Sequence, residues 1–145
     1  MIVYLDTSAL IKLYVKEEGT ALVLKMLKSA DLVATSKVAY VEARAVMARL
    51  RREGLLKEQA YQLVKESFQQ DWNNYLLVEL SNTVINMGGE MTESYKLRGF
   101  DAIHLASALM LKKQLEQDIT GGCWDARLWD AFKDNMDVFP ADRPG

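Results

Sequence analysis

The sequence predicts an α/β protein with a three-layer α/β/α architecture, in which helices cover both faces of a central parallel sheet. Short apolar runs of strand character alternate with longer segments of helical periodicity, without a linker or an internal repeat. Strands separated by helices pair in parallel through right-handed crossovers. Half of the 145 residues are apolar, which suffices for one well-buried core. We therefore expect a single domain over residues 1–145.

Five segments are expected to be strands. The first, at 2–5, is a run of four apolar residues, typical of a strand that is buried on both faces. The fourth is weakened as a prediction by Gly121 and Gly122, because glycine disfavours strand interiors. The five expected strands are 2–5, 32–35, 76–80, 118–124 and 137–139.

Helical spacing of apolar residues accounts for most of the remaining chain. Thr7 or Ser8 is expected to cap a helix directly after the first strand, and Ser36 to cap a long helix after the second. Two adjacent glycines, Gly88 and Gly89, weaken the helix expected around them. The expected helices are 7 to about 14, 17–30, 36–53, 57 to about 74, 82–98, 101 to about 116, and 125–133.

The composition excludes several classes of protein. A net charge of −2 creates no general attraction for nucleic acid, so a polyanion must be held by a local basic patch or by metal. The single cysteine, Cys123, excludes an internal disulfide and a cysteine-based zinc site. No apolar run approaches the roughly 20 residues that span a bilayer. Since no secretory leader precedes the first strand, we expect a cytoplasmic protein without membrane contact.

Four acidic residues are expected at one edge of the sheet. Asp6 follows the first strand, at the end where ligands bind in open α/β sheets. Asp101 and Asp125 each begin a helix, and helix capping alone would explain either of them. Glu42 lies on a helix face that is expected to be apolar, where an ion pair with a base such as Arg49 is the ordinary explanation.

Those separate explanations do not account for four acids on one side of the sheet. Carboxylates that are gathered together repel each other and resist ionisation unless a cation holds them. Oxygen donors without a histidine or cysteine pattern suit Mg²⁺ or Mn²⁺ better than zinc. The sequence therefore favours a divalent-metal site.

Three segments together resemble the signature segments of PIN-domain ribonucleases, and most closely those of VapC-type toxins from prokaryotic toxin–antitoxin pairs. They are LDTSALI at 5–11, Glu42 within its helix, and DAIHLASAL at 101–109. The resemblance extends over essentially the whole chain. It implies a parallel sheet, an acidic pocket for Mg²⁺ or Mn²⁺, endonucleolytic cleavage of RNA, a homodimer, and an inhibitory antitoxin whose tail enters the pocket.

The resemblance also assigns roles to the acids. Asp6, Glu42 and Asp101 match the three most dependable acids of the family. Asp125, within CWDARL at 123–128, matches the fourth, although Cys123 stands where the family usually has Ser or Thr. All four are expected to bind the metal and to act in catalysis.

Hydroxyl and basic side chains complete the expected site. Thr7 and Ser8 are expected to orient the carboxylates or a metal-bound water. Arg44, Arg49 and Arg98 are expected to contact RNA, although a basic run on a helix is more commonly a solvated face.

The chain offers no nitrogenous base for catalysis. His104 is the only histidine, and a packed or hydrogen-bonded structural role is expected for it. Water activated by a divalent ion is then the expected nucleophile, which leaves 5′-phosphate and 3′-hydroxyl ends.

Two alternatives compete with this hypothesis. A phosphatase of the haloacid-dehalogenase type also begins with a strand that ends in Asp, but it needs a second Asp where Ser8 stands. The other alternative is a non-catalytic PIN-like module that binds RNA or a partner. Four clustered acids argue against that module, since negative charge beside phosphates would weaken its binding.

Overall fold

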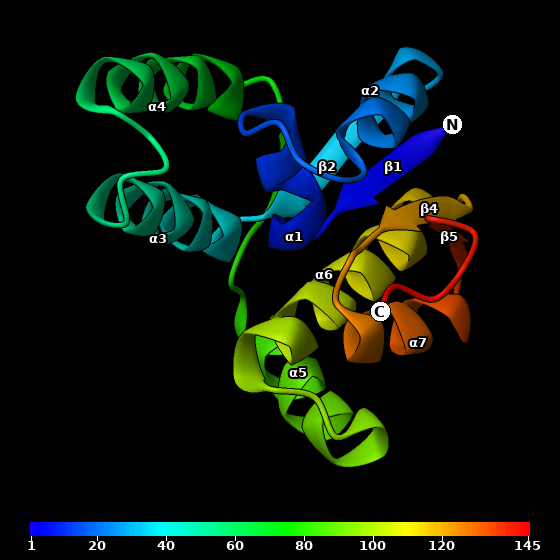
Figure 1. Cartoon of the computed structure of the whole chain (residues 1–145). Coiled ribbons are helices and arrows are strands. Elements are labelled where there is room, and N and C mark those ends of the chain that lie inside the picture. The colour runs from blue at the N-terminus through cyan, green and yellow to red at the C-terminus, as the bar shows by residue number, and fades with distance from the viewer.

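A computed structural model describes residues 1–145, and its centre is a five-stranded sheet whose strands all run parallel (Figure 1). The strand order is β3-β2-β1-β4-β5. The predicted α/β/α architecture is confirmed. The strands are β1 (Ile2–Leu5), β2 (Leu32–Ser36), β3 (Leu76–Val78), β4 (Ile119–Gly122) and β5 (Asp137–Phe139).

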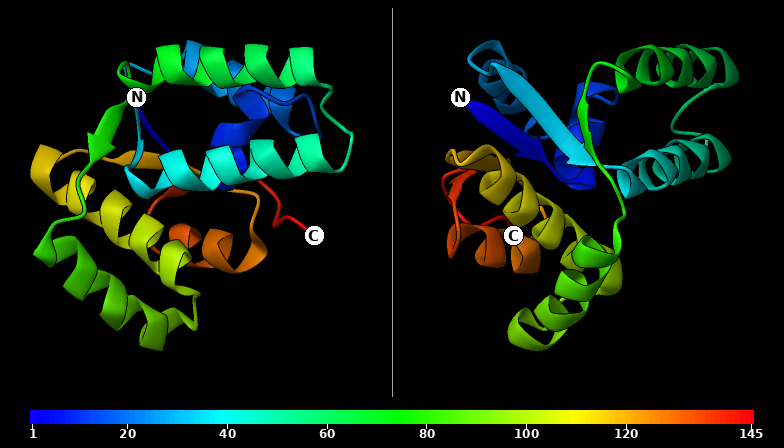
Figure 2. Two further views of the ribbon diagram at one scale, coloured as in Figure 1. Left: turned by 90° about the vertical axis from the view of Figure 1, so that its left-hand side faces the viewer. Right: turned by 180° about the vertical axis from the view of Figure 1, so that it is seen from behind.

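Helices cover the two faces of this sheet in two groups (Figure 2). The apolar side chains of β1 alternate between the faces, as strand geometry requires. Val3 and Leu5 pack with α1 to α4, whereas Ile2 and Tyr4 pack with α5 to α7. The helices are α1 (Thr7–Leu10) with the 3₁₀ turn η1 (Ile11–Leu13), α2 (Thr20–Lys28), α3 (Val38–Arg52), α4 (Glu58–Trp72), α5 (Asn82–Tyr95), α6 (Gly99–Leu115) and α7 (Ala126–Lys133).

Helix starts and glycines are where the structure differs from the sequence expectations. Asp6, and not Thr7 or Ser8, caps α1, because the Asp6 carboxylate accepts the Ala9 N–H. Helix α6 begins two residues before Asp101, which lies in its first turn. The glycine pair at 121 and 122 does not interrupt β4 but lies within it. Glycine is needed at 121 because a Cβ there would lie 2.6 Å from the Phe132 ring and would push α7 off the sheet.

The strand order reverses direction between β1 and β4, and this arrangement creates the crevice for a site. The chain leaves β1 toward α1 on one face and leaves β4 toward α7 on the other. Ligands bind at such a switch point, beyond the carboxyl ends of the strands. Just past the ladder, the Asp6 N–H still donates to the Gly122 carbonyl at 3.2 Å, which holds the two loops side by side.

Two further observations concern the helices. Helices α3 and α4 form a hairpin that extends away from the sheet (Figures 1 and 2). None of the helices combines the length and the apolar character that a membrane crossing demands.

Candidate functional site

Four acidic side chains from four separate segments gather at the carboxyl edge of the sheet. A hollow of about 510 Å³ is lined by Glu42 from α3, by Asp125 at the start of α7, and by the first turn of α6, which supplies Asp101. Asp6 caps α1 and is only 3% exposed, so it lies beneath the surface rather than on the lining.

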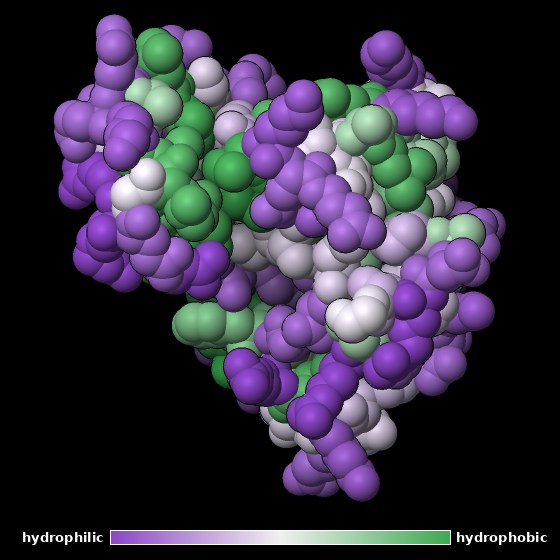
Figure 3. All heavy atoms as spheres, viewed as in Figure 1, coloured by the Kyte–Doolittle hydropathy of each residue, from purple (hydrophilic) through white to green (hydrophobic).

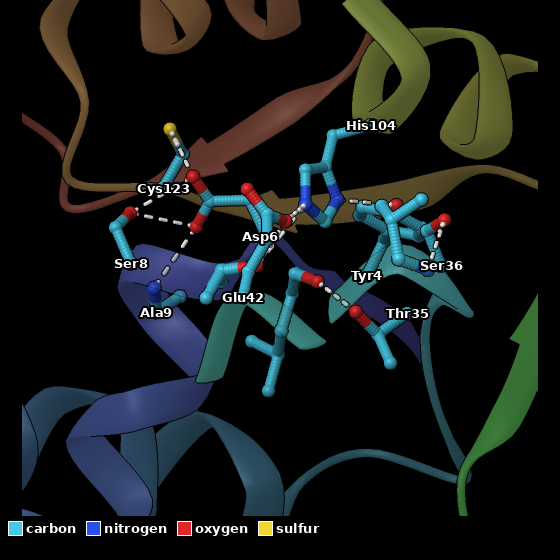
Figure 4. A network of polar contacts seen from close by, with 12 residues as sticks. Tyr4, Asp6, Ser8, Ala9, Thr35, Ser36, Glu42, His104 and Cys123 are labelled. Carbon is cyan, nitrogen blue, oxygen red and sulfur yellow. Dashed lines mark hydrogen bonds and ion pairs between the residues drawn. The ribbon is translucent and has the colours of Figure 1, made fainter. Parts of the chain in front are cut away.

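Asp6 is held by hydrogen-bond donors on three sides (Figure 4). The Ser8 hydroxyl lies 2.7 and 2.8 Å from the two carboxylate oxygens, and the Ala9 N–H donates at 2.9 Å. The Cys123 thiol donates to Oδ2 from 3.2 Å. Burial nevertheless outweighs these contacts and raises the pKa of Asp6. Asp6 is therefore a fixed carboxyl group whose charge is costly without a cation.

Glu42 is also held by the chain itself. His104 Nε2 lies 2.8 Å from Glu42 Oε1, and the Thr7 hydroxyl donates to the same oxygen at 2.6 Å. Burial alone would raise the pKa of Glu42, but the hydrogen bonds and the charge of His104 bring it below its usual range. Of the bases considered for Glu42, Arg49 is not its partner, since Arg49 pairs with Glu53 at 3.9 Å, and the base that Glu42 contacts is His104.

The expected apolar stripe around Glu42 was also wrong. The buried face of α3 consists of Val38, Ala39, Ala43 and Met47, and Glu42 lies at its border. The border position explains how Glu42 reaches both the hollow and a buried hydrogen-bond network.

Asp101 and Asp125 have a more open environment. Asp125 caps α7, with its Oδ1 accepting the Leu128 N–H at 3.0 Å. Burial, together with the negative charges of Asp125 and Asp6, raises the pKa of Asp101 to about 6. No hydrogen bond offsets these effects at Asp101. The two aspartates thus form an electrostatically crowded half of the site.

The donor chemistry of this cluster fits a hard divalent cation, because every acid offers carboxylate oxygens. The side chains are not, however, drawn together around one point, since no three acidic, histidine or cysteine side chains are grouped closely enough to hold an ion. Glu42, Asp101 and Asp125 share the hollow and are the residues that could hold a metal there.

The three arginines expected to contact RNA lie in different environments. Arg98 is exposed and lines the hollow beside the acids. Arg44 donates to Tyr40 on its own helix at 2.9 Å, and Arg49 is engaged by Glu53. The structure thus brings only Arg98 to the acidic hollow, and RNA contact by all three stays a prediction.

Sequence reasoning missed two residues of the site. Cys123 was noted only as a departure from pattern, yet its thiol hydrogen-bonds to Asp6. Phe100 was not singled out, although it lines the hollow with its side chain 58% exposed. The available signal was its place in the sequence, between Arg98 and Asp101 at a helix start.

Comparisons with known proteins identify the family of this chain. The family model of the PIN domain matches residues 3–115. Ribonuclease VapC49 of Mycobacterium tuberculosis is 34% identical over 127 residues, which are 88% of this chain and 86% of that protein. Ribonuclease VapC47 of the same species is 32% identical over 130 residues, with 87% and 86% covered.

Solved structures share the fold at lower sequence identity. PAE2754 from Pyrobaculum aerophilum superposes with a TM-score of 0.65 at 16% identity, covering 94% of this chain and 83% of that one. FitAcB from Neisseria gonorrhoeae gives 0.64 at 20% identity, with 96% of both chains covered. VapBC2 from Rickettsia felis, bound to a DNA fragment from their promoter, gives 0.64 at 15% identity, covering 95% and 97%. The family match and the identity to the curated ribonucleases show that this chain belongs to the PIN-domain family.

Proposed function

We propose that this chain is a divalent-metal-dependent endoribonuclease and the toxin of a toxin–antitoxin pair. One observation carries the proposal: acids from three segments line one hollow at the switch point of the sheet, and a fourth, Asp6, is buried at the same edge. The relatives named Ribonuclease VapC support it, as they align over 88% of this chain. We take residues 1–145 as one nuclease domain, because Asp125, which caps α7, lies beyond the matched 3–115 and still lines the hollow.

The acidic and hydroxyl side chains of the site have separate roles in this proposal. We assign Asp6, Glu42, Asp101 and Asp125 to holding Mg²⁺ or Mn²⁺, directly or through water. A bound divalent ion lowers the pKa of a water and neutralises charge on the phosphoryl oxygens. Thr7 and Ser8 hold carboxylates in place through their hydroxyls. The products would carry 5′-phosphate and 3′-hydroxyl ends.

Arg98 and Phe100 are the best-placed contacts for the substrate. Arg98 forms no salt bridge within the chain, so its guanidinium is free to bind a phosphate. The other three phenylalanines are at most 4% exposed, whereas Phe100 is in contact with solvent at the hollow. An exposed aromatic ring beside a phosphate site suits the stacking of an unpaired base. We therefore propose single-stranded RNA as the substrate.

An antitoxin is the proposed protein partner. A solved structure from Klebsiella pneumoniae that shares the fold is a toxin–antitoxin complex, and a second chain of that kind would hold this nuclease in check. An Arg or Lys of the antitoxin would pair with Asp6, Glu42 or Asp101 in place of the metal. Figure 3 shows apolar surface between α3 and α4, and Val41 of α3, Leu63 of α4 and Leu55 of the loop that joins them are exposed. Such surface suits an apolar partner segment. We also propose a homodimer that acts on RNA in the cytoplasm.

Cleavage of a defined RNA panel tests the enzymatic part. We expect cleavage of single-stranded segments in Mg²⁺ or Mn²⁺, no cleavage in EDTA, and little in Ca²⁺, whose looser coordination positions water poorly. Phe100→Ala should raise KM by about fivefold or more with a smaller effect on kcat, because base stacking contributes roughly 1–3 kcal/mol per base. Cleavage that persists in EDTA would contradict the metal-dependent mechanism.

Growth of an expressing host tests the toxin part. The wild-type chain alone should slow growth, co-expression of the adjacent small gene should restore it, and Asp6→Asn alone should be harmless. If the wild-type chain is benign in cells while the purified chain cuts RNA freely, a housekeeping nuclease becomes the better account. If the chain binds RNA but never cuts it, the non-catalytic module is the better account.

A further inference from the structure

We infer that His104 is a positioning residue of the active site, whose Nε2–H fixes one oxygen of Glu42 so that the other is presented to metal or metal-bound water. This role rests on the proposed function, since it assumes that Glu42 serves a metal site. It differs from the structural role that the sequence suggests for His104, because its effect is exerted on a side chain of the hollow.

The contacts of His104 link the sheet to α3 through the imidazole ring (Figure 4). His104 projects from α6 and is 1% exposed. On one side, Nδ1 lies 2.8 Å from the hydroxyl of Tyr4, a fully buried residue of β1. On the other side, Nε2 lies 2.8 Å from Glu42 Oε1. The ring is therefore held from behind while it contacts the carboxylate.

The direction of the contact to Glu42 follows from its chemistry. An ionised carboxylate only accepts hydrogen bonds, so the hydrogen must be carried by His104 Nε2. Thr7 donates to the same oxygen at 2.6 Å. Two donors therefore hold Oε1, whereas Oε2 makes no hydrogen bond within the chain. Oε2 is the oxygen left for an ion or a bound water.

Glu42 needs such support because its backbone gives it little. It lies at the border of the buried face of α3, its side chain is 23% exposed, and three rotatable bonds separate the carboxylate from the helix. Without the Nε2–H, the side chain would keep a single donor, Thr7, and would sample rotamers that turn it into solvent. Groups that orient metal ligands in this way typically change metal affinity or activity by about 10–100-fold when they are removed.

Two amide substitutions separate positioning from a merely structural role. The amide nitrogen of His104→Gln falls near the place of Nε2 and can still donate to Glu42. The shorter His104→Asn places its amide near Nδ1, where it can bond Tyr4 but cannot reach Glu42. A structural role predicts that both variants lose function in step with their thermal stability, whereas positioning predicts that only Asn weakens the site.

The experiment measures Mn²⁺ binding by isothermal titration calorimetry on the full chain, without RNA. We expect His104→Gln to bind within about threefold of wild type and His104→Asn to bind about 10–100-fold more weakly. Leu111→Ala, two turns further along α6 and buried away from the hollow, is the control for lost stability. It should bind Mn²⁺ like wild type at temperatures where it is folded.

A second readout follows the donor itself. His104 is the only histidine, so a ¹⁵N spectrum of the imidazole contains one ring, and we expect its Nε2 to carry hydrogen. Equal Mn²⁺ affinity of wild type and His104→Asn, equal losses in both amide variants, or an unprotonated Nε2 would each overturn the assignment. So would a wild-type chain that binds no Mn²⁺. A chain that binds Mn²⁺ as expected but cuts no RNA would refute the proposed function and leave the role of His104 standing.

Discussion

The two halves of the acidic hollow differ in what holds them. Asp6 and Glu42 accept hydrogen bonds from side chains of their own chain: Ser8 and Cys123 donate to the first, Thr7 and His104 to the second. The Asp101 carboxylate has no such donor, and its pKa is raised to about 6 by burial and by the charges of its acidic neighbours. One half is therefore ordered before any ligand arrives, and the other is strained by unpaired charge.

This difference indicates how the fold prepares for a cation. Preformed carboxylates need no reorganisation when an ion binds, so they supply geometry. Crowded carboxylates gain most when their charge is neutralised, so they supply the driving force for binding. Substitution of Asp101, the most crowded of the acids, should thus abolish activity and stabilise the free chain, whereas substitutions among the supporting donors should weaken activity by smaller factors.

The largest effect is expected from Asp101→Asn. The substitution keeps the shape of the side chain and removes a charged donor from the hollow, so cleavage in Mg²⁺ should fall by about a thousandfold or more. Asp125→Asn should have the mildest effect among the four acids, because its amide oxygen can still cap α7 and its amide nitrogen replaces an oxygen that accepts no hydrogen bond within the chain. Initial rates on one RNA, at equal folded fraction by circular dichroism, check both. Wild-type rates in folded Asp101→Asn would remove it from the site.

A smaller loss is expected when the support of Glu42 is weakened. Thr7→Val keeps the volume of the side chain but deletes the hydroxyl that donates at 2.6 Å. Since His104 still donates to the same oxygen, cleavage should fall by only about tenfold. Thr7→Ser retains the hydroxyl and is the matched control. Equal rates in the Val and Ser variants would show that this hydrogen bond does not matter to the reaction.

The pH dependence of stability probes the crowded half without any substrate. The pKa of Asp101 is raised in the folded chain, so its contribution to stability is complete below the unfolded value of about 3.9 and is lost as the pH rises through about 6. Without metal, Asp101→Asn should therefore be more stable than wild type at pH 7, by about 1 kcal/mol after solvent screening, and nearly equal to it at pH 4. Urea denaturation at both pH values measures the gap, and added Mg²⁺ should close it. A stability difference that is the same at both pH values would contradict the raised pKa of Asp101.

The architecture could be predicted from the sequence, because the order and type of its elements are encoded in the local spacing of apolar residues. The order of strands and helices and the burial of β1 on both faces follow from runs such as Ile2–Leu5. Local patterns also place Asp6 at a strand end. They fail where a distant side chain decides the outcome: Gly121 reads as an interruption until the Phe132 ring is seen against it.

The supporting contacts of the site lie beyond sequence reasoning for the same reason. His104 and Glu42 are 62 positions apart, and Cys123 and Asp6 are 117 positions apart. No local pattern predicts such a contact, because each contact depends on how distant elements pack across the sheet. A lone histidine or cysteine in an apolar segment is, in sequence, indistinguishable from a core residue.

The smallest effect is expected at Cys123, the most weakly bonded support of Asp6. Its thiol donates to Asp6 Oδ2 from 3.2 Å, and a thiol is a weak donor. The Ser8 hydroxyl reaches the same oxygen at 2.8 Å. Cys123→Ser should therefore cut RNA within about threefold of wild type, because its hydroxyl can replace a contact that contributes little.

Cys123→Ala provides the sharper comparison, since it removes the donor without adding a new one. We expect Ala to be slower than Ser, but by less than the loss caused by Ser8→Ala, which deletes the hydroxyl that reaches both oxygens of Asp6. Initial rates of the three variants at equal folded fraction give the ranking. If Cys123→Ala were as slow as Ser8→Ala, the thiol would contribute as much as the hydroxyl to holding Asp6, and the buried half of the site would depend on the segment after β4 as much as on α1.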